Sequence, residues 1–409
     1  MDRSAKLTLH DQELLRAHWE QWSGHEVIAE SRLRRLLDDY PSDLDAWHEL
    51  AEVRFHNAAV LGRSFVDARS AFEHALDAPS LAPSARVHLA RIAAYEGDTT
   101  TTARLAAAES AAAVDDQRAE EIRLLDAAAR SDGNAAAPLV ARLSGADAVH
   151  IWSTAWSVAQ YAGNWRLAER IGLLLTTEER SGGARGAGWL AIATFRMAAG
   201  RPIAADGALG ELAEISPEHA VVVRAGFAAL PALGDVERSR IQQAIAGLRS
   251  SAAKTGAKDS TSMYSLVGSA SAMRQLVLDR LLHPYDRAGA RDRRYELVGQ
   301  GLPIQPIFPA QGSARLELGL AALADNNPSE AERVFNLVIQ PDAFDVLLMT
   351  PVARARAAAA TKRGDVETAT RALARAAWLS RDAEPASAGA SIASAASLPV
   401  LETTAVRPH

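Results

Sequence analysis

Apolar residues recur at intervals of three and four along most of the chain, and they do so in pairs of neighbouring runs. The pair between Leu44 and Ala78 is the clearest, with a turn around Gly62. The residues that share one face are Trp47, Leu50 and Ala51 in the first run, and Ala68, Phe72 and Ala75 in the second. This spacing is typical of a helix that packs on a neighbour, so the stretch is predicted to form two packed helices.

The pattern returns along the chain and predicts an all-α protein. Trp189 and Ala193 follow Trp152 and Trp156 at the same interval of 37 residues, as expected of a repeating unit. Runs of β-branched residues with strict alternation are missing, which argues against a sheet. Further helix pairs are expected at 11–39, 84–114, 117–143, 219–249, 318–338 and 357–376, with other helices at 266–282 and 286–301.

Turn signals divide the predicted array. Gly97 is expected to end a helix, and Asn327 followed by Pro328 is expected to start one. The stretch GGARGAG at 182–188 is predicted to be a linker between helices, because a phosphate-binding loop would need GxxxxGK[ST] after a strand. The predicted organisation is an N-terminal tail at 1–10, a repeat array at 11–253, a mobile loop at 254–262, C-terminal repeats at 263–381 and a disordered, low-complexity tail at 382–409.

The order of large and small residues within a pair resembles the tetratricopeptide repeat, a helix-turn-helix unit of about 34 residues. The segments WHELAEVRFH, LGRSFVDARSAFEHAL, HLARIAAYEGD and WRLAERIGLLL are similar to the repeat regions of some bacterial serine/threonine protein kinases, and related regions occur in BTAD-type activators. The resemblance implies a right-handed α-α solenoid that acts as a sensory or partner-binding region. The catalytic motifs of a kinase are not found in the sequence.

Composition and charge narrow the range of functions. The chain is 48% hydrophobic but only 5% aromatic, which suits closely packed helices. Its formal net charge of -6 is spread over interspersed acidic and basic residues, so no nucleic-acid footprint is predicted. The absence of cysteine excludes disulfides and thiolate chemistry. No apolar run approaches the length of a membrane span, so a cytoplasmic protein without a membrane partner is expected, and its oligomeric state stays open.

The resemblance also implies a binding surface, because the first helix of each tetratricopeptide unit lines a concave groove. Carrying those positions over gives the predicted groove residues His48, Glu52, Phe55, His56, Arg91, Tyr95, Ser157, Gln160, Tyr161, Thr194 and Met197. A polar groove with aromatic edges suits an extended peptide. The function predicted is therefore a non-catalytic scaffold or sensory module for a protein or peptide ligand. The alternatives are a groove filled by the chain's own tail or by water, and a regulatory region working with a separate kinase or transcription activator.

One part of the groove permits a different chemistry. His48-Glu49-Leu50-Ala51-Glu52 differs by one residue from the zinc motif H-E-x-x-H, and His48, Glu52 and His56 share one helix face. The sequence offers no obvious distant ligand, so a solvated or partner-facing stripe is preferred over a metal-dependent hydrolase. No metal, cofactor or catalytic residue is predicted.

Overall fold

The computed structural model describes residues 7–111, 117–229, 246, 310–341 and 345–384. Within these residues every regular element is a helix, so the all-α prediction is confirmed. The predicted helix at 236–249 lies outside the described residues except for residue 246. The predicted helices at 266–282 and 286–301, the loop at 254–262 and most of the C-terminal tail lie outside them entirely.

Successive helices pack against each other in pairs, as the repeat pattern predicts. In chain order they are α1 (Leu9–Trp22), α2 (Glu26–Asp39), α3 (Leu44–His56), η2 (Phe65–Ala68), α4 (Arg69–Ala75), α5 (Ala82–Glu96), α6 (Thr99–Ala111), α7 (Gln117–Ala129), α8 (Gly133–Leu143), α9 (Ala148–Ser157), η3 (Val158–Ala162), α10 (Trp165–Leu173), α11 (Gly182–Ala198), α12 (Pro202–Ile215), α13 (Pro217–Ala229), α18 (Ala310–Ala324), α19 (Pro328–Phe335), η5 (Asp345–Leu348), α20 (Met349–Arg363) and α21 (Val366–Leu379).

Local chemistry sets the ends of these helices. The Asp43 side chain accepts a hydrogen bond from the backbone N–H of Ala46 and caps the start of α3. Gly97 ends α5 with φ of +76°, a conformation that favours glycine, as predicted. Asn327 caps α19 through the N–H of Glu330, and Pro328 occupies the first turn, also as predicted.

The glycine-rich stretch at 182–188 is not a linker, which corrects the sequence-based prediction. It forms the first two turns of α11, and the Ser181 side chain caps the helix by accepting from the N–H of Ala184. A Cβ atom at Gly188 would lie 2.8 Å from Cβ of Leu175 and 3.1 Å from the carbonyl oxygen of Gly172. Glycine therefore allows α11 to approach α10 closely, at a position where a larger residue would not fit.

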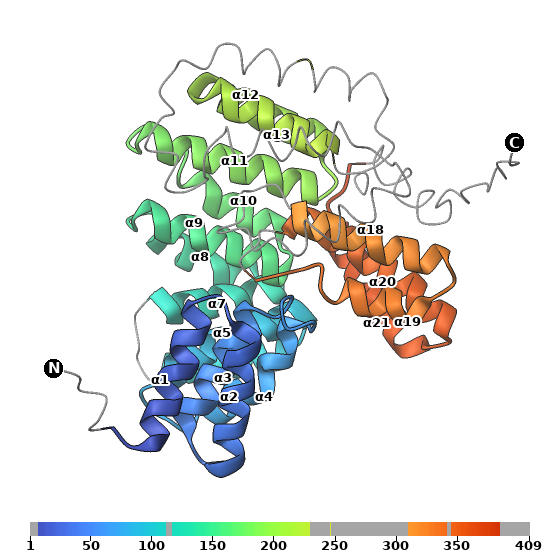
Figure 1. The fold of residues 1–409 in the computed structure, drawn as a ribbon. Coiled ribbons are helices and arrows are strands. Elements are labelled where there is room, and N and C mark those ends of the chain that lie inside the picture. Colours follow the sequence, from blue (N-terminus) through green and yellow to red (C-terminus); the bar gives the residue numbers. More distant parts are fainter. Residues whose placement is uncertain (1–6, 112–116, 230–245, 247–309, 342–344, 385–409) are drawn as a thin grey trace, which may run out of the picture.

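The helix pairs from α1 to α13 rise in one column, and the pairs from α18 to α21 lie beside the middle of that column (Figure 1). The C-terminal repeats thus contact residues about midway along the first array. Trp165 donates from Nε1 to the carbonyl oxygen of Leu379 at 2.6 Å, and Trp378 donates to that of Ala162 at 2.9 Å. These bonds join residues more than 200 positions apart in the sequence.

The carbonyl groups at the end of η3 explain why α21 packs against this part of the first array. The last carbonyl groups of a helix have no partner within the helix and carry partial negative charge. The Arg375 guanidinium donates to the carbonyl oxygen of Tyr161 at 2.9 Å, and Arg381 donates to that of Gly163 at 3.2 Å. Burial lowers the pKa of Arg375 to about 10, which leaves it a cation at neutral pH. Side chains from α21 and the residues after it therefore cap a helix of the first array.

The predicted tail begins as ordered structure. The N–H of Glu384 donates to the carbonyl oxygen of Gly200 at 3.0 Å. The Glu384 carboxylate accepts from the N–H groups of Ile203 and Ala204, each at 3.2 Å. A carboxylate at the start of α12 is well placed, because the first N–H groups of a helix lack partners. Residues 382–384 thus belong to the packed structure rather than to a disordered tail.

No helix in the described part of the chain is both long and apolar enough to cross a membrane.

Asp345 lies fully buried at the start of η5, close to Arg315. Its Oδ2 atom accepts the N–H of Gln340 at 3.1 Å, whereas Oδ1 has no hydrogen-bond partner. Burial raises the pKa of Asp345 to about 7, even though the hydrogen bond and the Arg315 charge oppose that rise. The folded chain therefore keeps a proton on this carboxyl group well above the pH at which an exposed aspartate loses it.

We expect this carboxyl group to make stability depend on pH. Between about pH 4 and pH 7 the folded state holds a proton that the unfolded state releases, so the free energy of unfolding falls as pH rises through that window and levels off above it. The contribution is at most about 4 kcal/mol. Asp345→Asn should remove this decline, which urea unfolding across the window would measure. A difference between variant and wild type that does not change with pH would contradict the expectation.

Candidate functional site

The predicted groove residues come from α3, α5, α9, η3 and α11, and the structure buries several of them. Phe55, Thr194, Gln160, Tyr161 and Ser157 are buried, whereas the remaining six are partly exposed: His48, Glu52, His56, Arg91, Tyr95 and Met197. The structure therefore separates the predicted groove into a buried part and an accessible part.

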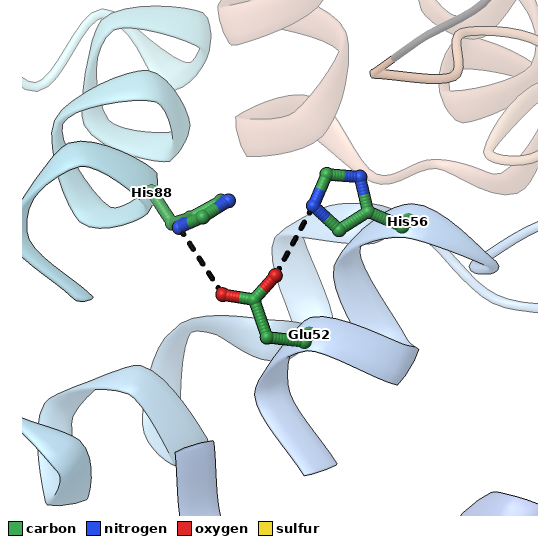
Figure 2. A group of neighbouring side chains, drawn as sticks. All are labelled: Glu52, His56 and His88. Atoms are coloured by element: carbon green, nitrogen blue, oxygen red, sulfur yellow. Dashed lines mark ion pairs between the residues drawn. The ribbon is translucent and has the colours of Figure 1, made fainter. Parts of the chain in front are cut away.

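The accessible part centres on Glu52, in the middle of α3 (Figure 2). Its carboxylate oxygens lie 3.4 Å from Nε2 of His48 and 3.2 Å from Nε2 of His56, one turn to either side. His88 reaches the same carboxylate from α5, with Nδ1 at 3.6 Å. Ser84 also donates its hydroxyl to Glu52, at 3.4 Å. We call Glu52, His48, His56 and His88 the histidine cluster.

Burial and charge fix the protonation of two members of the histidine cluster. Burial alone would raise the pKa of Glu52, but the hydrogen bond from His56 and the nearby histidines lower it to about 2. Burial lowers the pKa of His88 to about 4, against the opposing effect of the Glu52 charge. At neutral pH the cluster thus contains a carboxylate and a neutral imidazole on facing helices.

A second polar network connects α5, α7 and the end of α9. Arg91 donates two hydrogen bonds to the Glu121 carboxylate, at 2.8 and 2.9 Å, and Ser157 donates its hydroxyl to the same carboxylate. Although burial disfavours its charge, Arg91 and Ser157 keep the pKa of Glu121 below its usual range. The Arg91 guanidinium also lies 5.6 Å from the ring centre of Tyr161. Arg91 therefore holds neighbouring helices together.

The buried part of the predicted groove is covered by the chain itself. Gln160 donates its amide N–H to the carbonyl oxygen of Gln340, and the Tyr161 hydroxyl donates to that of Pro341 at 3.4 Å. The N–H of Ala59 donates to the Gln340 side chain at 3.2 Å. Gln340 and Pro341 follow α19, and we call these two residues the inner segment. This segment precedes the predicted tail at 382–409, so the alternative in which the chain's own tail fills the groove is not tested by this contact.

Three other predicted groove residues have structural contacts. Thr194 is fully buried and donates its hydroxyl to the carbonyl oxygen of Leu190, one turn earlier in α11. Met197 packs against the hydrophobic core. Tyr95 contacts the Phe65 ring, with centres 4.9 Å apart, and lies under the Arg375 guanidinium. Among the predicted positions, His48, Glu52 and His56 of the histidine cluster thus remain partly exposed on one helix.

Sequence reasoning missed His88 and Glu121. His88 stands 36 residues after Glu52, close to one repeat length, so it occupies the equivalent helix of the next pair. That offset of 36 residues could have identified His88 as the distant metal ligand that is not obvious in the sequence. Glu121 carried no comparable signal, because the register of the pair at 117–143 is weak.

Comparisons with known proteins assign the chain to no family. No family model matches the chain. No curated protein matches it either. Among solved structures, the chain is similar to the crystal structure of the P58(IPK) TPR domain, with 12% identity, a TM-score of 0.24 and coverage of 98% of this chain and 100% of the other. The helix pairs themselves define the class, an α-solenoid of successively packed pairs.

Proposed function

We propose that this chain is a protein-interaction scaffold whose inner surface binds an extended peptide. The observation that supports the proposal is the way Gln160 and Tyr161 hold the inner segment. Both side chains donate to main-chain carbonyl groups, of Gln340 and Pro341. Main-chain recognition accepts many peptide sequences, and nearby side chains then supply selectivity.

In this proposal the inner segment takes the place of a partner's peptide. A competing peptide would have to displace it from Gln160 and Tyr161, so binding and release of the C-terminal repeats would be coupled. The partner would be a protein of a bacterial signalling pathway, such as a separate kinase or transcription activator, as the sequence resemblance implies. The scaffold itself would contribute no catalytic residue.

A synthetic peptide that spans residues 333–348 provides the test. We expect the labelled peptide to bind the full-length Trp378→Ala variant, in which the bond from Trp378 to the carbonyl oxygen of Ala162 is lost and the C-terminal repeats are loosened. Fluorescence anisotropy would measure the affinity. Adding Gln160→Ala to that variant should weaken binding by about 2- to 13-fold, the usual contribution of one hydrogen bond.

A matched control keeps the test specific. Gln12→Ala removes a glutamine of α1, whose side chain donates to the Leu7 carbonyl oxygen, and should leave peptide affinity unchanged. Equal affinity with and without Gln160 would show that the peptide binds elsewhere. Absence of any binding to the Trp378→Ala variant would make the inner segment a fixed part of the core, and the proposal would fail.

A further inference from the structure

The histidine cluster has the composition and spacing of a metal site. We propose that Glu52, His56 and His88 bind a divalent transition-metal ion of the zinc type. One ligand atom from each of the three lies within 4.8 Å of the others. Imidazole nitrogens with one carboxylate oxygen are a donor set that zinc commonly takes, with a further position left for water or another ligand. This inference is independent of the proposed peptide binding.

The separations within the cluster suit coordination better than ordinary ion pairing. A tetrahedral zinc ion with bonds of about 2.0–2.1 Å holds its ligand atoms about 3.3–3.4 Å apart. One carboxylate oxygen of Glu52 lies 3.2 Å from Nε2 of His56. Charge-assisted hydrogen bonds are shorter, at about 2.7–2.9 Å. Glu52 and His56 therefore stand close to the spacing that a shared ion requires, and the ligand atom of His88 lies within 4.8 Å of both.

Contacts around the cluster orient its ligands. Nδ1 of His88 lies 3.0 Å from the carbonyl oxygen of Ser84, so a proton on Nδ1 leaves the lone pair on Nε2. Figure 2 shows this second nitrogen of His88 turned toward the side of His56. A hydrogen bond from the other ring nitrogen to a backbone carbonyl is the usual outer support of a metal-binding histidine. The Phe72 ring stacks on His88, with centres 4.6 Å apart, and holds the imidazole in place.

His48 flanks the same carboxylate. Its Nε2 atom is buried and lies 3.4 Å from Oε1 of Glu52, which is longer than a charge-assisted hydrogen bond. We assign His48 the role of positioning Glu52 beside the ion.

The ion would join two helix pairs, because Glu52 and His56 belong to α3 whereas His88 belongs to α5. Binding to the folded chain alone would raise its thermal stability as metal concentration rises above the dissociation constant. Glu52 is a ligand in this arrangement, and it is therefore not available as the general base that the hydrolase alternative would need. The inference departs from the sequence-based expectation of no metal because His88 supplies the ligand from a neighbouring helix.

Titration calorimetry of the chelator-treated, full-length chain with Zn²⁺ alone tests the inference. We expect one equivalent to bind, and His88→Gln and Glu52→Gln each to weaken affinity by at least about 100-fold. His48→Gln should weaken it by about 10-fold, as expected of an outer residue. His25→Gln is the matched control, since His25 is exposed and pairs with Glu20, and it should bind as wild type does.

A spectroscopic measurement guards against variants that fail to fold. Co²⁺ in a four-coordinate site absorbs visible light far more strongly than hydrated Co²⁺. With Co²⁺ added, wild type and His25→Gln should therefore show strong visible absorbance, and His88→Gln should not. Circular dichroism of each metal-free variant would check its helix content. The inference is overturned if wild type binds no Zn²⁺, or if folded His88→Gln and Glu52→Gln bind it as tightly as His25→Gln does.

Discussion

Gly163→Ala is expected to destabilise the chain by about 2–5 kcal/mol, because two costs add at this position. Gly163 has φ of +61°, where a residue with a Cβ atom costs about 1–2 kcal/mol. A Cβ atom would also collide with Cδ2 of Leu379, a side chain that is only 1% exposed and has little room to move. Overpacking of this kind costs about 1–3 kcal/mol. Urea unfolding would measure the total.

Gly97→Ala is the matched control for that substitution. Gly97 has φ of +76°, yet a Cβ atom there would meet nothing within 4 Å. It should therefore lose only the backbone part, about 1–2 kcal/mol. Hydrogen exchange adds a local readout, since Gly163→Ala should speed exchange in α21 (Val366–Leu379) whereas Gly97→Ala should not. Equal exchange of α21 in both variants would show that this contact does not hold the C-terminal repeats in place.

Phe55→Ala is expected to cost about 3–5 kcal/mol, the usual loss for removing a buried aromatic side chain. Phe55 is fully buried, and its ring packs edge-on against Phe65 and His88, with centres 5.4 and 4.7 Å apart. The substitution leaves a cavity between α3, η2 and α5. The midpoint of thermal or urea unfolding would measure the loss.

Trp19→Ala provides the comparison, because Trp19 is 72% exposed on α1. Its removal should change the free energy of unfolding by no more than about 0.5 kcal/mol. A similar loss for both variants would contradict the assignment of Phe55 to the core. The result also decides how the groove should be probed, because Phe55→Ala would act on folding before it acted on any ligand.

Many helices could be predicted from local sequence. The predicted positions were most accurate where an apolar stripe or a helix-ending residue was clear. The stripe around Phe72 and the stop at Gly97 both placed helices correctly, because each depends on residues within one or two turns. The sequence predicts a linker at 182–188, which is wrong, because glycine has low intrinsic helix propensity and local sequence alone does not indicate a helix there. Packing of Gly188 against α10 overrides that propensity and holds the stretch in α11.

The candidate site was only partly predictable. His48, Glu52 and His56 were found because they share one face of one helix. His88 belongs to another helix, and its approach to Glu52 depends on how successive pairs rotate against each other. Phe55 was placed in the groove by repeat register, but the structure buries it because η2 and α5 close over that face.

The sequence by itself determined that the chain forms helix pairs, where many of those helices end, and which faces are apolar. Only the tertiary structure decided what covers each face. The inner segment lies on Gln160 and Tyr161, and α21 caps the end of η3 through Arg375. The spacing of apolar residues indicates that a helix face must be buried. It does not indicate which residues of the same chain, some 180 or 214 positions away, will cover that face. Such contacts form only when stacked pairs bring distant segments together, so they are properties of the packed chain.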